Sequence, residues 1–241
     1  MGKVYLVGSG PGDPELVSLK AYKLIKEADV ILVDRLVLGV KRLIPKDKKV
    51  IDIGKTSSEH KCSQDAINAL LVELSKKYEK VVRLKGGDPY IFGRGGEEAT
   101  FLREKGVEFE VVPGITSAIA VPALFAIPLT YRGFSSAVTI ITGHEMEEKE
   151  EELDWQAVAK LKGTLIILMG IRNLDKNVEK LLKNGMPPDT PVAVIEKGFT
   201  EDARIVCGTM GNIVELTMKE AVQPPAVIVI GDVVRIREKL R

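Results

Sequence analysis

Short apolar runs, separated by segments with helical spacing, constrain the fold of this chain more than any other feature. Most runs are continuous stretches of β-branched and other apolar residues rather than strict polar–apolar alternations. Strands of this kind are buried on both faces, as in a sheet that is covered by helices. The runs form an early set and a late set: 4–8, 30–34, 50–54, 81–85 and 109–113, then 138–143, 165–170, 192–196, 205–207 and 227–231.

Two sets of about five strands predict an α/β protein with two domains. The join is expected within the segment IPLTYRGFSS, where Pro128 and Gly133 interrupt the pattern. The predicted domains are therefore residues 1–131 and 132–241. Crossover helices are expected over 14–28 and 63–77, with Asp13 and Ser63 as their N-caps.

The composition narrows the classes of partner. The chain has 241 residues and a formal net charge of +1, which gives no global attraction to nucleic acid or to an anionic membrane. No apolar run approaches the ~20 residues of a membrane span. A strand begins within the first three residues, so we expect no signal peptide and a cytoplasmic location. Cys62 and Cys207 lie outside any CxxC or Cys/His cluster, which predicts reduced cysteines and no metal site.

Glycines and ionisable residues gather where the early runs end. In an open α/β sheet, ligands bind outside the carboxyl ends of the strands. Several glycines in a row also permit close approach of the backbone to a ligand. The segments at these ends are GSGPGD, DRLV, GKT, KGGDPYIFGRGGEE and PGITS, in chain order. The sequence therefore predicts a ligand site at this edge of the first sheet.

The opening loop resembles the dinucleotide fingerprint, but Asp13 occupies the position of its third glycine. Asp34 closes the second run about where a ribose-binding acid would stand, which supports a nucleotide-binding oxidoreductase. Against this alternative, Asp13 would repel a pyrophosphate and Pro11 lacks the backbone N–H that would bind one. A ligand without phosphates and with a positive charge fits better, and S-adenosylmethionine is such a ligand.

Together, these motifs resemble the uroporphyrinogen-III C-methyltransferases, which belong to the tetrapyrrole methylases. DRLV combined with KGGDPYIFGRGGEE is the most specific part of the resemblance. It implies two αβα domains, each with a roughly five-stranded mixed sheet, a cofactor cleft between them, and a homodimer. The resemblance covers nearly the whole chain through VGSGPGDPELVSLKA, DRLV, GK with HKCSQDAIN, VVRLKGGDPYIFGRGGEE, VVPGITSA, IPLTYR and TGH.

The resemblance implies methylation of two pyrrole carbons of uroporphyrinogen III by S-adenosylmethionine. The products would be S-adenosylhomocysteine and precorrin-2, the branch point to sirohaem, cobalamin and related macrocycles. A later precorrin methyltransferase of the same fold is the nearest alternative, although DRLV and GRGGEE favour the first activity. A dimeric sensor that binds the cofactor without turnover is a further alternative.

Site residues follow from matching positions in the family. The resemblance implies Asp34 as proton acceptor and Lys55 as proton donor. Because the substrate carries many carboxylates and arginine binds carboxylates bidentately, Arg35, Arg94 and Arg132 are the predicted substrate contacts. Thr56 and Tyr131 depart from the family pattern, and we expect them to affect substrate docking more than the cofactor site. The implied cofactor contacts are Pro11, Gly86, Gly87, Asp88, Ile91, Thr116, Ser117, Met169, Gly198 and Ala226.

Overall fold

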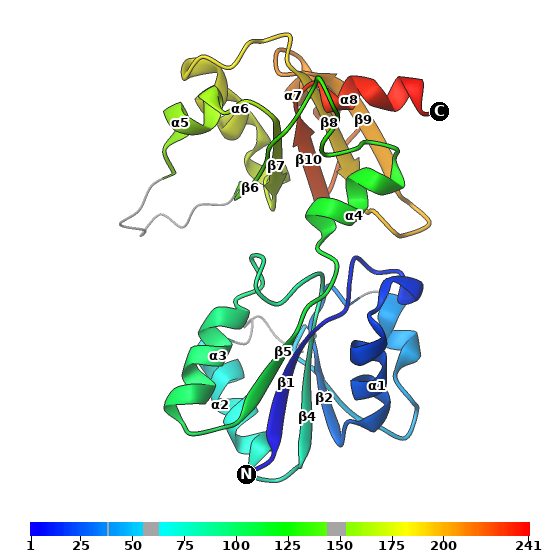
Figure 1. The fold of residues 1–241 in the computed structure, drawn as a ribbon, viewed down its shortest axis with the longest axis vertical. Helices are drawn as coiled ribbons and strands as arrows, with labels where there is room; N and C mark the ends of the chain where they lie inside the picture. Colours follow the sequence, from blue (N-terminus) through cyan, green and yellow to red (C-terminus); the bar gives the residue numbers. More distant parts are fainter. Residues whose placement is uncertain (38, 55–62, 144–152) are drawn as a thin grey trace. The chain divides into compact units, whose positions relative to one another are not determined.

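The computed structural model describes residues 1–37, 39–54, 63–143 and 153–241. The chain forms two compact units, Met1–Thr116 and Ser117–Arg241, and each unit is an αβα sandwich around a five-stranded sheet (Figure 1). This confirms the predicted fold class.

The sheet of the first unit is parallel throughout, with strand order β3-β2-β4-β1-β5. The expectation of a mixed sheet is therefore wrong for this unit. Parallel neighbours cannot be joined by tight hairpins, so the connections must cross over the faces of the sheet. The strands are β1 (Lys3–Gly8), β2 (Val30–Val33), β3 (Lys49–Asp52), β4 (Lys80–Lys85) and β5 (Phe109–Val112).

Helices cover both faces of this parallel sheet (Figure 1). Alternate residues of β4 point to opposite faces of the sheet. Val82 and Leu84 pack in the core beneath α1 (Leu19–Glu27). Val81 packs on the other face, in the core beneath α2 (Gln64–Ser75) and α3 (Gly95–Glu104). Arg83 and Lys85 share the face of Val81, because side chains two residues apart point the same way.

Two helix starts test the predicted N-caps. Ser63 caps α2 as predicted, since its hydroxyl accepts from the backbone N–H of Ala66 at 3.2 Å. Asp13 caps only the short 3₁₀ helix η1 (Pro14–Leu16), and its carboxylate accepts from the N–H of Glu15 at 2.9 Å. The main helix α1 begins later, after its own cap, Ser18. A further 3₁₀ segment, η2, spans Gly39–Leu43.

The sheet of the second unit is mixed, as expected, with order β6-β7-β10-β8-β9 and one parallel pair, β6 with β7. One face packs against α5, α6 and α7 and the other against α4 and α8. The strands are β6 (Val138–Thr142), β7 (Thr164–Leu168), β8 (Pro191–Glu196), β9 (Arg204–Thr209) and β10 (Ala226–Ile230). The helices are α4 (Ser117–Leu124), α5 (Trp155–Lys160), η3 (Ile171–Asn173), α6 (Leu174–Lys183), α7 (Ile213–Lys219), α8 (Val233–Ile236) and η4 (Arg237–Lys239).

The two units divide between Thr116 and Ser117, N-terminal to the boundary expected at residue 131. The residues between the observed and the expected boundary form α4 and the segment after it. Ala118, Val121 and Ile127 are buried in a core cluster with β7, β8 and β10, so this stretch packs with the second unit although it precedes Pro128. In the ranges that the structure describes, no helix is long and apolar enough to span a bilayer.

Candidate active site

The loops that follow β1 and β4 are joined by a pair of glycines. The N–H of Gly10 donates to the carbonyl of Gly87 at 3.2 Å, and the N–H of Gly87 donates to the carbonyl of Gly10 at 2.8 Å. Both residues have a positive φ, 74° and 67°, which glycine adopts without steric cost. The N–H of Ser9 is also engaged, with the carbonyl of Lys85 at 2.8 Å.

This pairing decides what the opening loop can bind. A phosphate loop presents free backbone N–H groups at a helix N-terminus. Here the N–H groups of Ser9 and Gly10 are already used, Pro11 has none, and the carboxylate of Asp13 caps the first turn that follows. The loop is therefore poorly suited to a pyrophosphate, and it fits a nucleoside ligand that carries none.

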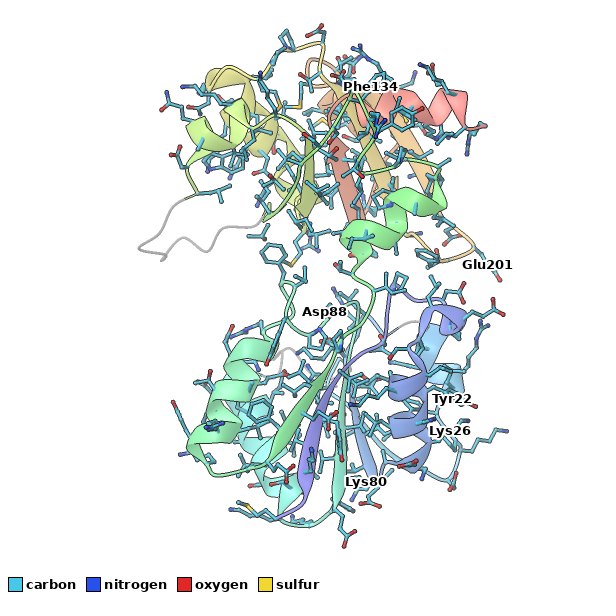
Figure 2. All side chains as sticks on the ribbon, in the orientation of Figure 1. Tyr22, Lys26, Lys80, Asp88, Phe134 and Glu201 are labelled. Atoms are coloured by element: carbon cyan, nitrogen blue, oxygen red, sulfur yellow. The ribbon has the colours of Figure 1, made fainter. Side chains whose placement is uncertain are left out.

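Asp88 ties the loop after β4 to the loop after β5. One carboxylate oxygen accepts from the N–H of Tyr90 at 2.8 Å and the other accepts from the N–H of Gly114 at 3.0 Å. Figure 2 shows Asp88 at the carboxyl end of the parallel sheet, with Lys80 at the opposite end. Since both of its oxygens serve the backbone, Asp88 holds the loop in shape.

The other strand ends meet in the same region. A Cβ built on Gly54 would lie 2.8 Å from Cα of Arg35, and one built on Gly86 would lie 2.9 Å from Cβ of Leu36. The loops after β2, β3 and β4 therefore lie against one another, as the sequence predicted for a shared sheet edge.

Replacing Asp88 with alanine is expected to release both backbone N–H groups and to lower the affinity for S-adenosylhomocysteine by about ten- to a hundredfold. Charge-assisted hydrogen bonds of this kind each contribute about 1.5–3 kcal/mol. Asp88→Asn keeps one acceptor oxygen and should lose less. Calorimetric titration of the two variants checks this order, and equal affinities in Asp88→Ala and the unmodified protein would contradict it.

Charged side chains form a buried network behind Asp34. The guanidinium of Arg83 donates from Nε to Oε1 of Glu98 at 3.2 Å and from Nη2 to Oδ2 of Asp34 at 3.3 Å. Lys85 Nζ donates to the same Glu98 oxygen at 2.8 Å. Arg83, Lys85 and Glu98 are buried, whereas the Asp34 side chain is 41% exposed. Burial lowers the pKa of Lys85, Arg83 lowers it further, and Glu98 opposes both effects.

The predicted substrate arginines differ in their surroundings. Arg94 is exposed, has a φ of 59°, and makes a two-pronged ion pair with Glu97, with Nε 3.0 Å from Oε1. This pairing raises the pKa of Arg94. Arg35 is exposed after β2, and Arg132 is exposed in the second unit. All three remain accessible to a polycarboxylate, whereas the buried Lys85 is not.

The predicted cofactor residues fall into two sets, one in each unit. In the first unit, Ile91 is exposed and Thr116 is buried, and they accompany Pro11, Gly86, Gly87 and Asp88. In the second unit, Met169 follows β7 with a φ of 54°, and the residue is 54% exposed. Gly198 lies against Val121, where a Cβ would come within 2.7 Å of Cγ2. Ser117 begins α4 and Ala226 begins β10.

Comparison with known proteins identifies the family. The model of the Tetrapyrrole (Corrin/Porphyrin) Methylases matches residues 3–214. The chain belongs to the tetrapyrrole methylases. Over 99% of its length it is 54% identical to an S-adenosyl-L-methionine-dependent uroporphyrinogen III methyltransferase of Methanosarcina barkeri, of which it covers 94%. It is also 49% identical to a uroporphyrinogen-III C-methyltransferase of Methanocaldococcus jannaschii, with 98% of each chain covered.

Solved structures agree with this assignment to the tetrapyrrole methylases. A uroporphyrin-III C-methyltransferase of Thermus thermophilus, complexed with S-adenosylhomocysteine, superposes with a TM-score of 0.84 at 41% identity and covers 98% of this chain and 100% of its own. A cobalt precorrin-4 methyltransferase superposes equally well but at only 27% identity, with 96% and 95% covered.

Some residues predicted for this tetrapyrrole methylase lie outside the described ranges. Lys55, the implied proton donor, is one of them, and so are Thr56 and Cys62. Cys207 is an exposed free thiol on β9. Among the described residues, no group of three or more His, Cys, Asp or Glu side chains could hold a metal ion.

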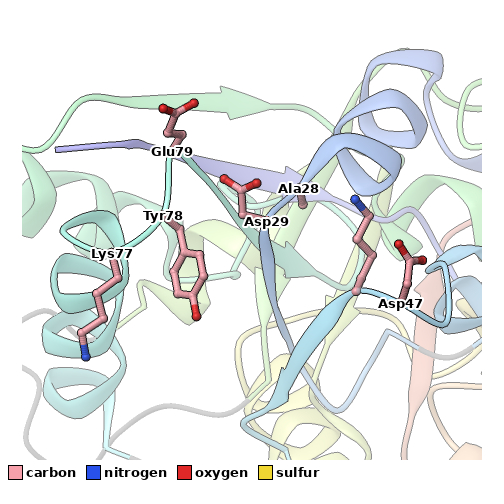
Figure 3. Close-up of a pocket in the computed structure, with 7 residues that line it drawn as sticks. Ala28, Asp29, Asp47, Lys77, Tyr78 and Glu79 are labelled. Atoms are coloured by element: carbon pink, nitrogen blue, oxygen red, sulfur yellow. The ribbon is translucent and has the colours of Figure 1, made fainter.

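A surface hollow lies away from these loops, where β2, β3 and β4 begin (Figure 3). Mixed charges line it, and its residues precede the strands rather than follow them. In α/β sheets the ligand site is at the carboxyl ends, so this hollow is not the candidate site. Its lining residues are Ala28, Asp29, Asp47, Lys48, Lys77, Tyr78 and Glu79.

Arg83 and the burial of Glu98 are functional features that were not predicted from the sequence. A usable signal was present: the central run VVRLK places a guanidinium and an ammonium on one face of a strand that must be buried on both faces. Buried charges require partners, and Glu98 is the acid in the first turn of the next helix. Glu97 and Glu98 both stand in the first turn of α3, but the structure separates them into an exposed and a buried acid.

Proposed function

We propose that this tetrapyrrole methylase transfers methyl groups from S-adenosylmethionine to two pyrrole carbons of uroporphyrinogen III, giving precorrin-2 and S-adenosylhomocysteine. The paired glycines Gly10 and Gly87 carry the proposal, because they use the N–H groups that a phosphate-bearing cofactor would need. The relatives at 54% and 49% identity support the choice of substrate.

The residues of the first unit fit the proposed cofactor. Their loops are rich in glycine, and the backbone N–H groups of Ser9, Gly10 and Gly87 are already bonded, which suits a cation without phosphates. Pro11, Gly86, Gly87, Ile91 and Thr116 would bind the nucleoside and amino-acid parts, with Asp88 tying the loop after β4 to the loop after β5. Contacts by Ser117, Met169, Gly198 and Ala226 remain predictions for the second unit.

When bound, S-adenosylmethionine supplies a methyl group, whose bond to sulfur breaks as the bond to the ring carbon forms. The electron pair for the new bond comes from the electron-rich pyrrole, and the broken bond leaves its pair on sulfur. Most of the rate enhancement in such an in-line displacement comes from alignment of the two reactants. The macrocycle then loses a proton from a bridging carbon, and we assign its acceptance to the carboxylate of Asp34. The family resemblance implies Lys55 as a proton donor, and this residue lies outside the described ranges.

Substrate recognition is proposed for the exposed arginines. Arg35 lies beside Asp34 in the sequence, and Arg94 already forms a two-pronged pair with a carboxylate. A substrate carboxylate could replace Glu97 as the ion-pair partner of Arg94 and keep the same two-pronged geometry. Arg132 is the third proposed contact. The homodimer is a prediction that follows from the family resemblance, and the cytoplasmic location is a prediction from the sequence.

Asp34→Asn is expected to lower turnover by about a hundredfold or more, the usual range for loss of a positioned general base. Affinity for S-adenosylhomocysteine should stay unchanged, because Asp34 is not among the proposed cofactor contacts. Asp29→Asn is the matched control: this carboxylate lies at the other end of the sheet, where it accepts from the N–H of Lys80. Equal turnover in the two variants would remove Asp34 from the mechanism.

The activity itself is tested by anaerobic incubation with uroporphyrinogen III and S-adenosylmethionine, followed by mass spectrometry. A macrocycle that has gained two methyl groups is the expected product. If uroporphyrinogen III is untouched but a methylated precorrin is accepted, the later-pathway alternative is correct. Cofactor binding without any methylated macrocycle would favour a sensor.

A further inference from the structure

We propose that Arg83 is a positioning residue that aims the Asp34 carboxylate, and that buried Glu98 holds Arg83 in place. The inference rests on the proposed function, because it assigns Asp34 a catalytic role. It concerns an arginine inside a central strand and the buried acid that it contacts.

Arg83 lies on β4, the middle strand of the parallel sheet, with only 2% of its side chain exposed. Its guanidinium reaches three acceptors: Oε1 of Glu98 at 3.2 Å, Oδ2 of Asp34 at 3.3 Å, and the carbonyl of Leu84 at 3.4 Å. The contact to Asp34 crosses to the neighbouring strand, since Leu32 of β2 pairs with Arg83 and Val33 pairs with Leu84. Arg83 therefore connects the buried interior to the end of β2.

Glu98 fixes the inner end of this connection. Its side chain is fully buried, and Oε1 accepts from Arg83 Nε, from Lys85 Nζ at 2.8 Å, and from Gln64 Nε2 at 3.4 Å. Within the described residues, its Oε2 has no hydrogen-bond partner. Glu98 thus links β4 to the first turns of α2 and α3, which limits the positions that the Arg83 guanidinium can occupy.

The outer end of the connection fixes Asp34. Its Oδ1 accepts from the backbone N–H of Arg35 at 2.6 Å, and its Oδ2 accepts from Arg83 Nη2. With 41% of its side chain exposed, Asp34 would otherwise rotate freely in solvent. Two donors set the plane of the carboxylate and still leave lone pairs to accept a proton, as a general base requires.

The chemistry of arginine explains why this position is not a lysine. A guanidinium carries several donors in a rigid fork and can contact two carboxylates at once, whereas an ammonium is a compact point charge. Lys85 shows the contrast on the same strand face, because its ammonium contacts Glu98 alone among the hydrogen bonds found for it in the described residues. The charged groups around Asp34 are Arg83 and Lys85 on β4, Glu98 on α3, and Arg35 beside it.

Arg83→Lys tests the inference, with Arg103→Lys as the control at an exposed position of α3. We expect turnover to fall on the order of ten- to a hundredfold, as for a misaligned catalytic group, with KM for uroporphyrinogen III and affinity for S-adenosylhomocysteine unchanged. Combined with Asp34→Asn, Arg83→Lys should cause no further loss. An equal loss in both backgrounds would show that Arg83 acts independently of Asp34 and would overturn the inference.

A second measurement needs neither turnover nor a folded Arg83 variant. In the NMR spectrum of the ¹⁵N-labelled protein, Asp34→Asn should shift the guanidinium resonances of Arg83 and leave those of Arg103 in place. Unmoved Arg83 resonances would overturn the inference. If the Arg83 resonances shift but the unmodified protein does not methylate uroporphyrinogen III, the contact is supported and the proposed function is refuted.

Discussion

Replacing Glu98 with alanine is expected to lower the free energy of unfolding by about 3–5 kcal/mol, the typical cost of leaving a buried ion without its partner. Arg83 and Lys85 both donate to Glu98 and both are buried. Removing the carboxylate would leave two cations in the interior with no other carboxylate partner, among the described residues, except the contact of Arg83 with Asp34.

The adjacent acid is the matched control for this experiment. Glu97 occupies the same helical turn of α3, but it is exposed and pairs with the exposed Arg94. Surface ion pairs typically contribute less than about 1 kcal/mol, so the urea midpoint of Glu97→Ala should be close to that of the parent protein. Urea denaturation of the two variants measures the difference, and similar midpoints would show that the buried network does not stabilise the fold.

The pH dependence of the free energy of unfolding of Glu98→Gln tests whether the Glu98 charge stabilises the protonated form of Lys85. Glu98→Gln removes the charge but retains the shape, so the pKa of Lys85, already lowered by burial, should fall further. The folded variant then binds fewer protons than the unfolded chain as the pH rises toward the ordinary lysine value of 10.5. Stability of the variant therefore rises relative to the parent protein in this range, and the difference measured at neutral pH should shrink.

Gly114→Ala is expected to disrupt the junction of three strand ends and to abolish measurable binding of S-adenosylhomocysteine. A Cβ at this position would overlap the carbonyl oxygen of Gly87 and lie 2.8 Å from Cα of Gly8. Both contacting atoms belong to the backbone, so the clash cannot be relieved by a change of side-chain rotamer. Overpacking typically lowers the free energy of unfolding by about 1–3 kcal/mol and occasionally more. Because the clash is with backbone atoms, we expect Gly114→Ala to lie at the upper end of this range.

Gly96→Ala is the corresponding control. Gly96 lies in α3, and no atom comes within 4 Å of a Cβ built there. Alanine should stabilise this helix by up to about 1 kcal/mol, with cofactor affinity unchanged. Thermal unfolding and calorimetry of both variants provide the measurements. Normal binding by Gly114→Ala would mean that the contact between the loops after β1, β4 and β5 is not needed for the site.

The strands themselves could be predicted from the sequence, because continuous apolar runs are a local pattern, whereas their order in each sheet was not predicted. Each apolar run became a strand, and the glycine-rich segments mark the edge where ligands bind in this fold class. The domain boundary could not be placed, because α4 (SAIAVPAL) is apolar around its whole circumference. Such a helix does not reveal which core it joins, and only the contacts of Ala118 and Val121 decide that.

The details of the site depend on register, which the sequence does not display. The pairing of Gly10 with Gly87 follows from the alignment of β1 with β4, where Gly8 stands opposite Lys85. The contact of Arg83 with Asp34 likewise follows from the alignment of β2 with β4. The sequence indicated that the opening loop was unsuited to phosphate through Asp13 and Pro11, and the structure adds that the N–H groups of Ser9 and Gly10 are already bonded.

The most direct test of this account is calorimetric titration of one protein sample with S-adenosylhomocysteine and, separately, with NADH. The paired loops predict saturable binding of S-adenosylhomocysteine and no heat of binding for NADH, because a pyrophosphate would have to break the hydrogen bonds between Gly10 and Gly87. Tight binding of NADH, with no response to S-adenosylhomocysteine, would contradict the account.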